Sequence, residues 1–218
     1  MHVLLIDDHF CAREGAACLL RELFTDLQVW QADSVAQGLA IARNTPLNLL
    51  LLDVQLPGQA DGLAGLEQFR SEFPDLCVVM YSALADRELV FETLRRGATG
   101  FICKTLPRPD FIQALQDVLS GKVYLPTTVL EQAAPLNAQL AGHSPTFGLT
   151  SREFEVLAAV VQGKSNKAIA RQLGIEEQTV KNHLRPVFQK LGVVRRSELL
   201  VKVFQQGMVF GKPAVGNY

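Results

Sequence analysis

Five residues at separated points of the sequence are of types that could together bind a metal ion and a phosphoryl group. They are two adjacent acids, a third acid, a hydroxyl and a lysine: Asp7, Asp8, Asp53, Ser82 and Lys104. Adjacent carboxylates repel each other, so a positive group must offset their repulsion. Carboxylate oxygens are ligands that Mg²⁺ prefers, and a lysine beside such a metal neutralises phosphoryl charge. We therefore expect these residues to bind Mg²⁺, or another divalent cation, and to take part in phosphoryl transfer.

Each of these five residues ends a short apolar run, in "VLLIDD", "NLLLLDV", "LCVVMYS" and "GFICK". Stretches with helical spacing separate the runs, and "QVWQA" is a weaker fifth run. The run "LLLL" has no polar alternation, which predicts a strand that is buried on both faces. Five strand–helix units over residues 1–122 predict an α/β fold, a doubly wound parallel five-stranded sheet covered on both faces. The carboxyl ends of parallel strands meet at one edge, so the five residues should converge there.

With these motifs residues 1–122 resemble the receiver domain of a two-component response regulator, which has a flavodoxin-like fold. The resemblance rests on the five residues above, on "LPG" after the third acid and on "GATGFICK" at the last strand. It implies that Asp53 is the phosphoacceptor. It also implies four metal-binding positions, one of them a backbone carbonyl: Asp7, Asp8, Asp53 and Gln55. Three residues would act as a switch that responds to the phosphoryl group: Ser82, Phe101 and Lys104.

The charge of the chain is divided unevenly along its length. Residues 1–147 carry 10 Lys and Arg against 17 Asp and Glu, a balance of −7, whereas residues 148–218 carry 11 against 5, a balance of +6. An acidic front and a basic back predict two modules with different partners, nucleic acid being the partner of the basic one. Residues 123–147 hold three prolines and no clear period. We expect a linker there, with one short helix around residues 129–134.

Residues 148–210 have helical spacing throughout and predict four short helices joined by tight turns. Thr150 followed three residues later by Glu153 predicts a capping box at the first of them. The pieces "LTSREFEVL", "GKSNKAIARQLGI", "TVKNHL" and "KLGV" resemble the LuxR-type helix-turn-helix of the NarL/FixJ family. The resemblance implies a small all-α DNA-binding domain after the receiver.

The third of these helices, "EEQTVKNHLRPVFQKLG", places apolar side chains on one face and donor-rich polar side chains on the opposite face. Such donors suit base edges in the major groove of double-stranded DNA. The resemblance implies three base contacts: Lys181, Asn182 and Arg185. It implies four contacts to DNA phosphates: Lys164, Lys167, Thr179 and Lys190. Pro186 lies well past the first turn of this helix, where we expect a kink and not a stop.

The combined resemblance implies a transcription regulator, not an enzyme, that a sensor histidine kinase switches by phosphorylating Asp53. Two alternatives stay open. One is an orphan regulator that works without phosphorylation, under the control of a ligand or a protein partner. The other is a phosphatase of the haloacid dehalogenase type, which also uses an aspartate, Mg²⁺ and a lysine. Against it, Gln55 stands where that family has a second acid that donates a proton.

A small helix-turn-helix reads few bases, so we expect a homodimer on paired half-sites when the protein is phosphorylated. The fourth helix, "SELLVKVFQQG", offers four apolar candidates for a dimer contact, some of which must serve the core of the domain: Leu199, Leu200, Val203 and Phe204.

Bulk properties predict a cytoplasmic protein that does not cross a membrane. No apolar run reaches the roughly 18 residues that a spanning helix needs, and "MHVLLIDDHF" lacks the basic start of a signal peptide. The cysteines form no C-x-x-C pair or zinc spacing, so we expect reduced core or helix residues: Cys11, Cys18, Cys77 and Cys103.

Overall fold

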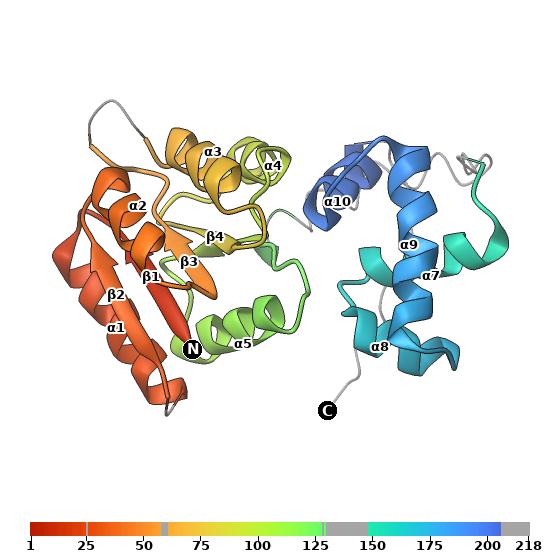
Figure 1. Ribbon diagram of the computed structural model, residues 1–218, viewed down its shortest axis with the longest axis horizontal. Coiled ribbons are helices and arrows are strands. Elements are labelled where there is room, and N and C mark those ends of the chain that lie inside the picture. The colour runs from red at the N-terminus through yellow and green to blue at the C-terminus, as the bar shows by residue number, and fades with distance from the viewer. Residues whose placement is uncertain (25, 58–60, 128, 130–147, 206–218) are drawn as a thin grey trace. The chain divides into compact units, whose positions relative to one another are not determined.

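The computed structural model describes residues 1–24, 26–57, 61–127, 129 and 148–205 (Figure 1). The described residues fall into two compact units. The first holds Met1–Leu119 and Tyr124–Pro126, and the second holds Ser120–Val123 and the described chain from Thr127 onward. Most of the expected linker, the short helix expected around residues 129–134 and the expected domain end at residue 210 lie outside the described residues. None of the described helices is long and apolar enough to cross a membrane.

The first unit is built on one five-stranded parallel sheet with the strand order β2-β1-β3-β4-β5. The strands are β1 (His2–Ile6), β2 (Gln28–Ala32), β3 (Leu49–Leu52), β4 (Cys77–Ser82) and β5 (Gly100–Cys103). In the register of the sheet Ile6 is paired with Leu52, and Ser82 is paired with Cys103. Neighbouring strands therefore end at nearly the same level, and the residues that follow them lie on one edge. The predicted α/β fold with a five-stranded parallel sheet is confirmed.

Five helices cover this sheet (Figure 1). They are α1 (Phe10–Leu23), α2 (Val35–Asn44), α3 (Gly62–Glu72), α4 (Arg87–Arg95) and α5 (Arg108–Leu119). Asp61 and Asp86 are N-caps whose carboxylates accept hydrogen bonds from the backbone N–H three residues on, which satisfies a donor that the helix leaves free. Ser34 stands at the N-cap of α2, as its position predicts, but its side chain makes no capping hydrogen bond.

The strands bury apolar side chains on both faces. On one face Leu5 of β1 and Leu51 of β3 pack with Leu20 of α1 and Leu115 of α5 in a single buried cluster. Alternation along the strands directs Leu4, Ile6, Leu50 and Leu52 to the opposite face, and all four are at most 1% exposed. On that face Ile6 approaches Gly38 of α2 so closely that a Cβ there would lie 2.2 Å from its Cδ1. This double burial explains the unbroken run "LLLL" of β3.

The second glycine that the fold requires is Gly62, at the start of α3. A Cβ at this position would lie 2.0 Å from the backbone oxygen of Asp53 and 2.7 Å from Cα of Val54. The N–H of Gly62 donates to the backbone oxygen of Val54 at 3.1 Å. The first turn of α3 therefore rests directly on the backbone that carries Asp53, and only glycine permits this approach.

The second unit is helical, with α7 (Ser151–Val161), α8 (Asn166–Leu173), α9 (Glu177–Leu191) and α10 (Arg196–Gln205) (Figure 1). The predicted capping box is present, because Thr150 accepts from the N–H of Glu153 and the Glu153 carboxylate accepts from the N–H of Thr150. Gly174 and Gly192 end α8 and α9 in the left-handed conformation, with φ of 64° and 65°. The four predicted helices are confirmed.

The core of the helical unit uses the apolar face of α9 and most of α10. Val180, Leu184, Val187 and Leu191 of α9 are buried together. Three of the residues expected to offer a dimer contact belong to this core, and the fourth packs against it: Leu199, Leu200, Val203 and Phe204. As expected, part of this set serves the core of the domain, since a small domain needs such side chains to fill its own interior. That the helix also forms a dimer contact stays a prediction.

Helix α9 continues without interruption through Pro186. The proline has no N–H to donate to the carbonyl of Asn182, yet Val187 and Leu191 beyond it stay in phase with the buried face. As expected, the proline does not stop the helix. That it bends α9 stays a prediction.

Candidate phosphoacceptor site and DNA-binding face

The carboxylates of the predicted cluster converge at the carboxyl edge of the sheet. Asp7 follows β1 and Asp53 follows β3, and the N–H of Asp53 donates to the backbone oxygen of Ile6 at 2.8 Å. Both side chains are buried, with 2% and 1% of their surface exposed. Asp8 is exposed beside them. The convergence follows from the parallel register, which brings the strand ends together.

Lys104 is the positive group that the adjacent acids require. Its Nζ lies 2.7 Å from Oδ2 of Asp53 and 2.7 Å from Oδ2 of Asp7. The backbone holds the side chain in place, because the N–H of Lys104 donates to the backbone oxygen of Ser82 at 2.8 Å. The ammonium also lies 5.6 Å from the ring centroid of Tyr81, in a cation–π contact. The sequence-based expectation that a cation offsets the acidic repulsion is confirmed.

The burial of the cluster shifts the pKa values of its groups. Burial raises the pKa of Asp53, and this effect outweighs the hydrogen bonds from Lys104 and from the N–H of Gln55 that favour the carboxylate. Burial alone would lower the pKa of Lys104, but hydrogen bonds and charge from Asp53 and Asp7 raise it. Burial, together with the charges of Asp7 and Asp53, raises the pKa of Tyr81 to about 12. The site therefore holds an ammonium and a neutral phenol at physiological pH.

The acidic residues have the geometry of a divalent cation site. Ligand atoms of Asp7, Asp8, His9 and Asp53 all lie within 4.8 Å of one another. Oδ2 of Asp7 is buried, and the ammonium of Lys104 lies 2.7 Å from it. A set of carboxylate oxygens gathered in this way fits a hard cation such as Mg²⁺. The sequence analysis missed His9, whose proximity to the acids depends on how its ring is turned.

The other residues expected around the phosphoacceptor are Gln55, Ser82 and Phe101. The N–H of Gln55 donates to Oδ1 of Asp53 at 3.2 Å. Ser82 ends β4 with none of its surface exposed, and its Oγ accepts from the N–H of Leu84 at 3.3 Å. Phe101 is fully buried on β5, and its backbone N–H donates to the oxygen of Tyr124. In this structure Phe101 therefore faces inward.

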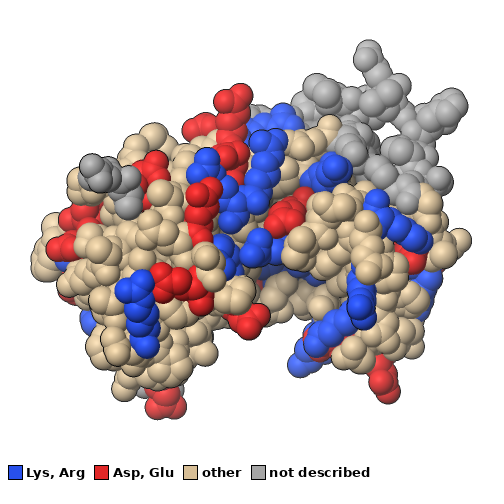
Figure 2. All heavy atoms as spheres, turned by 45° about the horizontal axis from the view of Figure 1, so that its top comes forward, with Lys and Arg blue, Asp and Glu red and all other residues tan. Residues whose placement is uncertain are grey.

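The polar face of α9 is presented to solvent. The three predicted base contacts are all exposed: Lys181, Asn182 and Arg185. Lys167 is exposed and Thr179 half-buried, whereas Lys164 donates to Gln172 Oε1 at 2.5 Å. Lys190 Nζ lies 2.6 Å from Glu153 Oε2, so its ammonium already has a partner. Figure 2 shows basic side chains on the surface of the helical unit, which agrees with its positive charge.

Arg196 is a basic residue of this surface that the sequence analysis missed. It begins α10 and lines the same pocket as Lys181 and Arg185. Its guanidinium donates to Asn166 Oδ1 at 3.2 Å and to the backbone oxygen of Lys164, while its buried Nε has no acceptor. Burial lowers the pKa of Arg196 to about 10. Both of these acceptors are neutral, so an anion would be a favourable neighbour.

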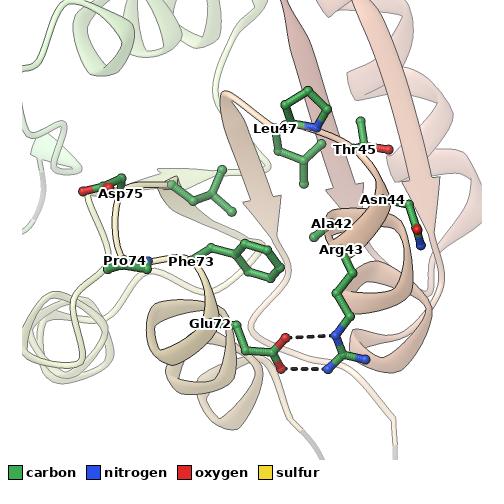
Figure 3. A pocket seen from close by; sticks show the side chains of 11 residues that line it. Ala42, Arg43, Asn44, Thr45, Leu47, Glu72, Phe73, Pro74 and Asp75 are labelled. Atoms are coloured by element: carbon green, nitrogen blue, oxygen red, sulfur yellow. Dashed lines mark hydrogen bonds and ion pairs between the residues drawn. The ribbon is translucent and has the colours of Figure 1, made fainter.

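A pocket of about 630 Å³ lies where α2 and α3 end, away from the carboxylate cluster. Arg43 and Glu72 point toward each other across it and form two hydrogen bonds of 2.9 and 2.8 Å (Figure 3). The hydrogen bond and charge of Glu72 raise the pKa of Arg43, and those of Arg43 lower the pKa of Glu72. Because the two charges satisfy each other, we assign this pocket no part in the chemistry.

Comparisons with known proteins agree with this arrangement. A family model described as "Response regulator receiver domain" matches residues 3–116, and one described as "Bacterial regulatory proteins, luxR family" matches residues 148–203. The nitrate/nitrite response regulator protein NarL of Escherichia coli (strain K12) is 35% identical over 208 residues, covering 94% of this chain and 95% of that protein. The glycerol metabolism activator of Pseudomonas putida is 33% identical over 206 residues, covering 91% and 93%.

A solved structure has the same fold across both units. It is RcsB from Salmonella enterica serovar Typhimurium bound to promoter rprA in the presence of the phosphomimetic BeF₃⁻, with a TM-score of 0.56. It is 21% identical and covers 93% of this chain and 98% of its own. This likeness concerns the fold alone, whereas the family rests on the two family models and on the relatives above 30% identity. The chain therefore belongs to the NarL/FixJ family of two-component response regulators, transcriptional regulators in which a receiver domain precedes a LuxR-type helix-turn-helix domain.

Proposed function

We propose that a sensor histidine kinase phosphorylates Asp53 in the cytoplasm and thereby converts this regulator into a homodimer that binds promoter DNA. The observation that carries the proposal is the ion pair of 2.7 Å between Lys104 Nζ and the buried carboxylate of Asp53. It places a cation beside the oxygen that would receive the phosphoryl group. The proposed receiver and DNA-binding domains comprise residues 1–122 and 148–210, joined by a linker over residues 123–147.

In the proposed reaction a carboxylate oxygen of Asp53 attacks the phosphorus of a phosphohistidine. A P–O bond forms, the P–N bond breaks, and the imidazole nitrogen keeps the electron pair and takes up a proton. Lys104 exchanges its ion pair with the carboxylate for one with a phosphoryl oxygen. When bound, Mg²⁺ neutralises charge on the phosphoryl oxygens. Four residues would hold it, with Gln55 contributing its carbonyl: Asp7, Asp8, Asp53 and Gln55.

Ser82 and Phe101 would respond to the new group. The Oγ of Ser82 accepts a long hydrogen bond of 3.3 Å from the N–H of Leu84, and its hydroxyl would donate its proton to a phosphoryl oxygen. Phe101 would then change its packing together with Ser82. The part of the fold that would change conformation on phosphorylation is thus the end of β4 and the neighbouring part of β5.

The proposed DNA contacts come from α9 and its surroundings. Lys181, Asn182 and Arg185 would read base edges in the major groove. Contacts to phosphates would come from residues on α8, α9 and α10 and just before α8: Lys164, Lys167, Thr179, Lys190 and Arg196. The promoter-bound structure of RcsB, which shares this fold, supports DNA as the partner.

The test of the phosphorylation site is incubation with Mg²⁺ and acetyl phosphate, followed by electrophoresis that retards phosphoproteins. The wild type should give one shifted band that hydroxylamine removes, because hydroxylamine cleaves acyl phosphates. The band should be absent in Asp53→Ala and present in Asp75→Asn, which changes an exposed acid of the same unit. A shifted band in Asp53→Ala would refute the assignment.

Two further measurements separate the alternatives. Steady release of inorganic phosphate from phosphate esters over many turnovers would support a phosphatase. DNA binding that is equally tight in the wild type and in Asp53→Ala would support an orphan regulator.

A further inference from the structure

The side chain of His9 lies beside the acidic cluster and contacts the carboxylates of Asp7 and Asp8. His9 is the N-cap residue of α1, but its side chain makes no capping hydrogen bond. Its backbone N–H donates to Asp7 Oδ1 at 2.9 Å, and any residue other than proline could make that bond. About 69% of its side chain is exposed. The imidazole is therefore accessible and could itself act as a ligand of a metal ion.

The ring is turned toward the carboxylates. Its Nδ1 lies 2.9 Å from Asp8 Oδ1 and 3.5 Å from Asp7 Oδ1. With Asp53 these groups offer four ligand atoms within 4.8 Å of one another. Two ligands on opposite sides of a metal ion, each about 2.2 Å from it, are about 4.4 Å apart. One ion could therefore contact the nitrogen and carboxylate oxygens after small side-chain movements.

The nitrogen changes the kind of ion that the cluster would favour. Mg²⁺ prefers oxygen ligands and retains its waters, so an imidazole adds little to its binding. First-row transition ions such as Ni²⁺ bind imidazole well, and their affinity increases along the series from Mn²⁺ to Cu²⁺. A site with three carboxylates and one imidazole should therefore have a higher affinity for transition ions, relative to its affinity for Mg²⁺, than a site with oxygen ligands alone.

We propose that His9 is a nitrogen ligand of the receiver metal site and that it gives this site a raised affinity for divalent transition ions relative to Mg²⁺. The proposal rests on the proposed function in one respect, namely that the acidic cluster holds a divalent cation. The same phosphoacceptor would then act with either class of ion, according to which one is available.

The direct test uses Mn²⁺ as a paramagnetic probe in the full-length protein. Pulsed electron paramagnetic resonance detects the coupling between a bound Mn²⁺ and a coordinated ¹⁴N nucleus. The wild type and the control His183→Gln, which changes a histidine of α9, should show this coupling. His9→Gln should bind Mn²⁺ but show no coupling. Nitrogen coupling that persists in His9→Gln, or that is absent from the wild type, would overturn the proposal.

Titration calorimetry provides the second measurement. His9→Gln should raise the Kd for Ni²⁺ by about tenfold or more, while the Kd for Mg²⁺ changes by less than about threefold. Equal losses for the two ions would show that His9 only orients Asp8 and would overturn the proposal. If neither ion binds to the wild type, both this inference and the proposed cation site fail. Thermal unfolding of His9→Gln and of His9→Asn, which restores a good N-cap, checks that each variant is folded.

Discussion

Lys104 is the residue on which the carboxylate cluster depends in the resting protein. One ammonium stands 2.7 Å from each of two carboxylates that are almost entirely buried. Two like charges at this depth cannot be stable without a cation. Lys104 therefore neutralises Asp7 and Asp53 in this structure, and in the proposed function it would neutralise a phosphoryl oxygen after phosphorylation.

Replacing Lys104 by Met should lower the free energy of unfolding of the metal-free protein by about 3 kcal/mol. This is the lower end for a broken buried pair, because 14% of the lysine side chain is exposed. Adding Asp53→Asn to the same chain should restore part of the loss by removing one unpaired carboxylate. Urea unfolding in the presence of a chelator measures both. If Lys104→Met unfolds at the wild-type urea concentration, the ion pairs do not stabilise the fold.

The raised pKa of Asp53 predicts a specific dependence on pH. A carboxyl whose pKa is higher in the folded than in the unfolded chain takes up its proton more readily when folded. Its contribution to stability is then fully present below the unfolded pKa, here 3.8, and is lost as pH rises through the folded value. The wild type should gain stability relative to Asp53→Asn as pH falls from 7 to below about 4. A difference that stays constant across this range would contradict the burial effect on Asp53.

At the scale of elements, the start of α3 and the reading helix α9 place the functional residues. In the helical unit local signals mark helix bounds well, because caps and helix-ending glycines act within a few residues. The capping box at Thr150 begins α7, and Gly174 and Gly192 end α8 and α9. The close approach at Gly62 could not be predicted, since it depends on how α3 rests on the strand end.

Gly62→Ala should destabilise the receiver unit by about 3 kcal/mol or more, because the new Cβ would meet backbone atoms that cannot turn aside. It should also slow phosphorylation by displacing Asp53. The matched control is Gly15→Ala in α1, where nothing lies within 4 Å of the added Cβ. That change should stabilise by about 0.5–1 kcal/mol, since alanine favours helix. Equal effects of the two substitutions in thermal unfolding would refute the argument.

Pro186→Ala should raise the free energy of unfolding of the helical unit by about 1–3 kcal/mol, because alanine restores the hydrogen bond to the carbonyl of Asn182. If the proline bends α9, the same change should re-aim Lys181, Asn182 and Arg185 and shift the preferred operator. Selection of binding sequences from a random DNA pool measures the preference, with Gln189→Ala on the same helix as control. Higher stability with an unchanged preference would show that the bend has no part in DNA reading.

At the scale of the whole molecule, the sequence predicted two modules of opposite charge and the residues that meet at the strand ends. Those predictions succeeded because a buried strand run and a parallel sheet leave little choice about where Asp7, Asp53 and Lys104 lie. The sequence did not predict the orientation of His9 or the hydrogen-bond partners of Arg196, because both depend on distances between side chains. Cys11 and Cys18 lie in helix α1, in line with the expected core or helix positions, but the sequence did not show that they are exposed. Helical spacing alone does not say which helix face a neighbour covers.

We propose that phosphorylation of Asp53 controls DNA binding and that Lys104 transmits the signal. Lys104→Ala should therefore still accept some phosphoryl group but gain no affinity for DNA. In this variant the attacking carboxylate remains, while the cation that pairs with the product is lost. Normal activation of Lys104→Ala would mean that the lysine has no part in the switch.

The most direct measurement is the affinity of the full-length protein for promoter DNA, by fluorescence anisotropy at one fixed salt concentration, with and without Mg²⁺ and acetyl phosphate. Phosphorylation should lower the Kd of the wild type by about tenfold or more, because dimerisation couples two reading helices. Footprinting of the phosphorylated protein should show protection of two half-sites. Asp53→Ala should show the weaker affinity under both conditions. A wild-type Kd that does not change with phosphorylation, or an Asp53→Ala protein that responds as the wild type does, would contradict the proposal.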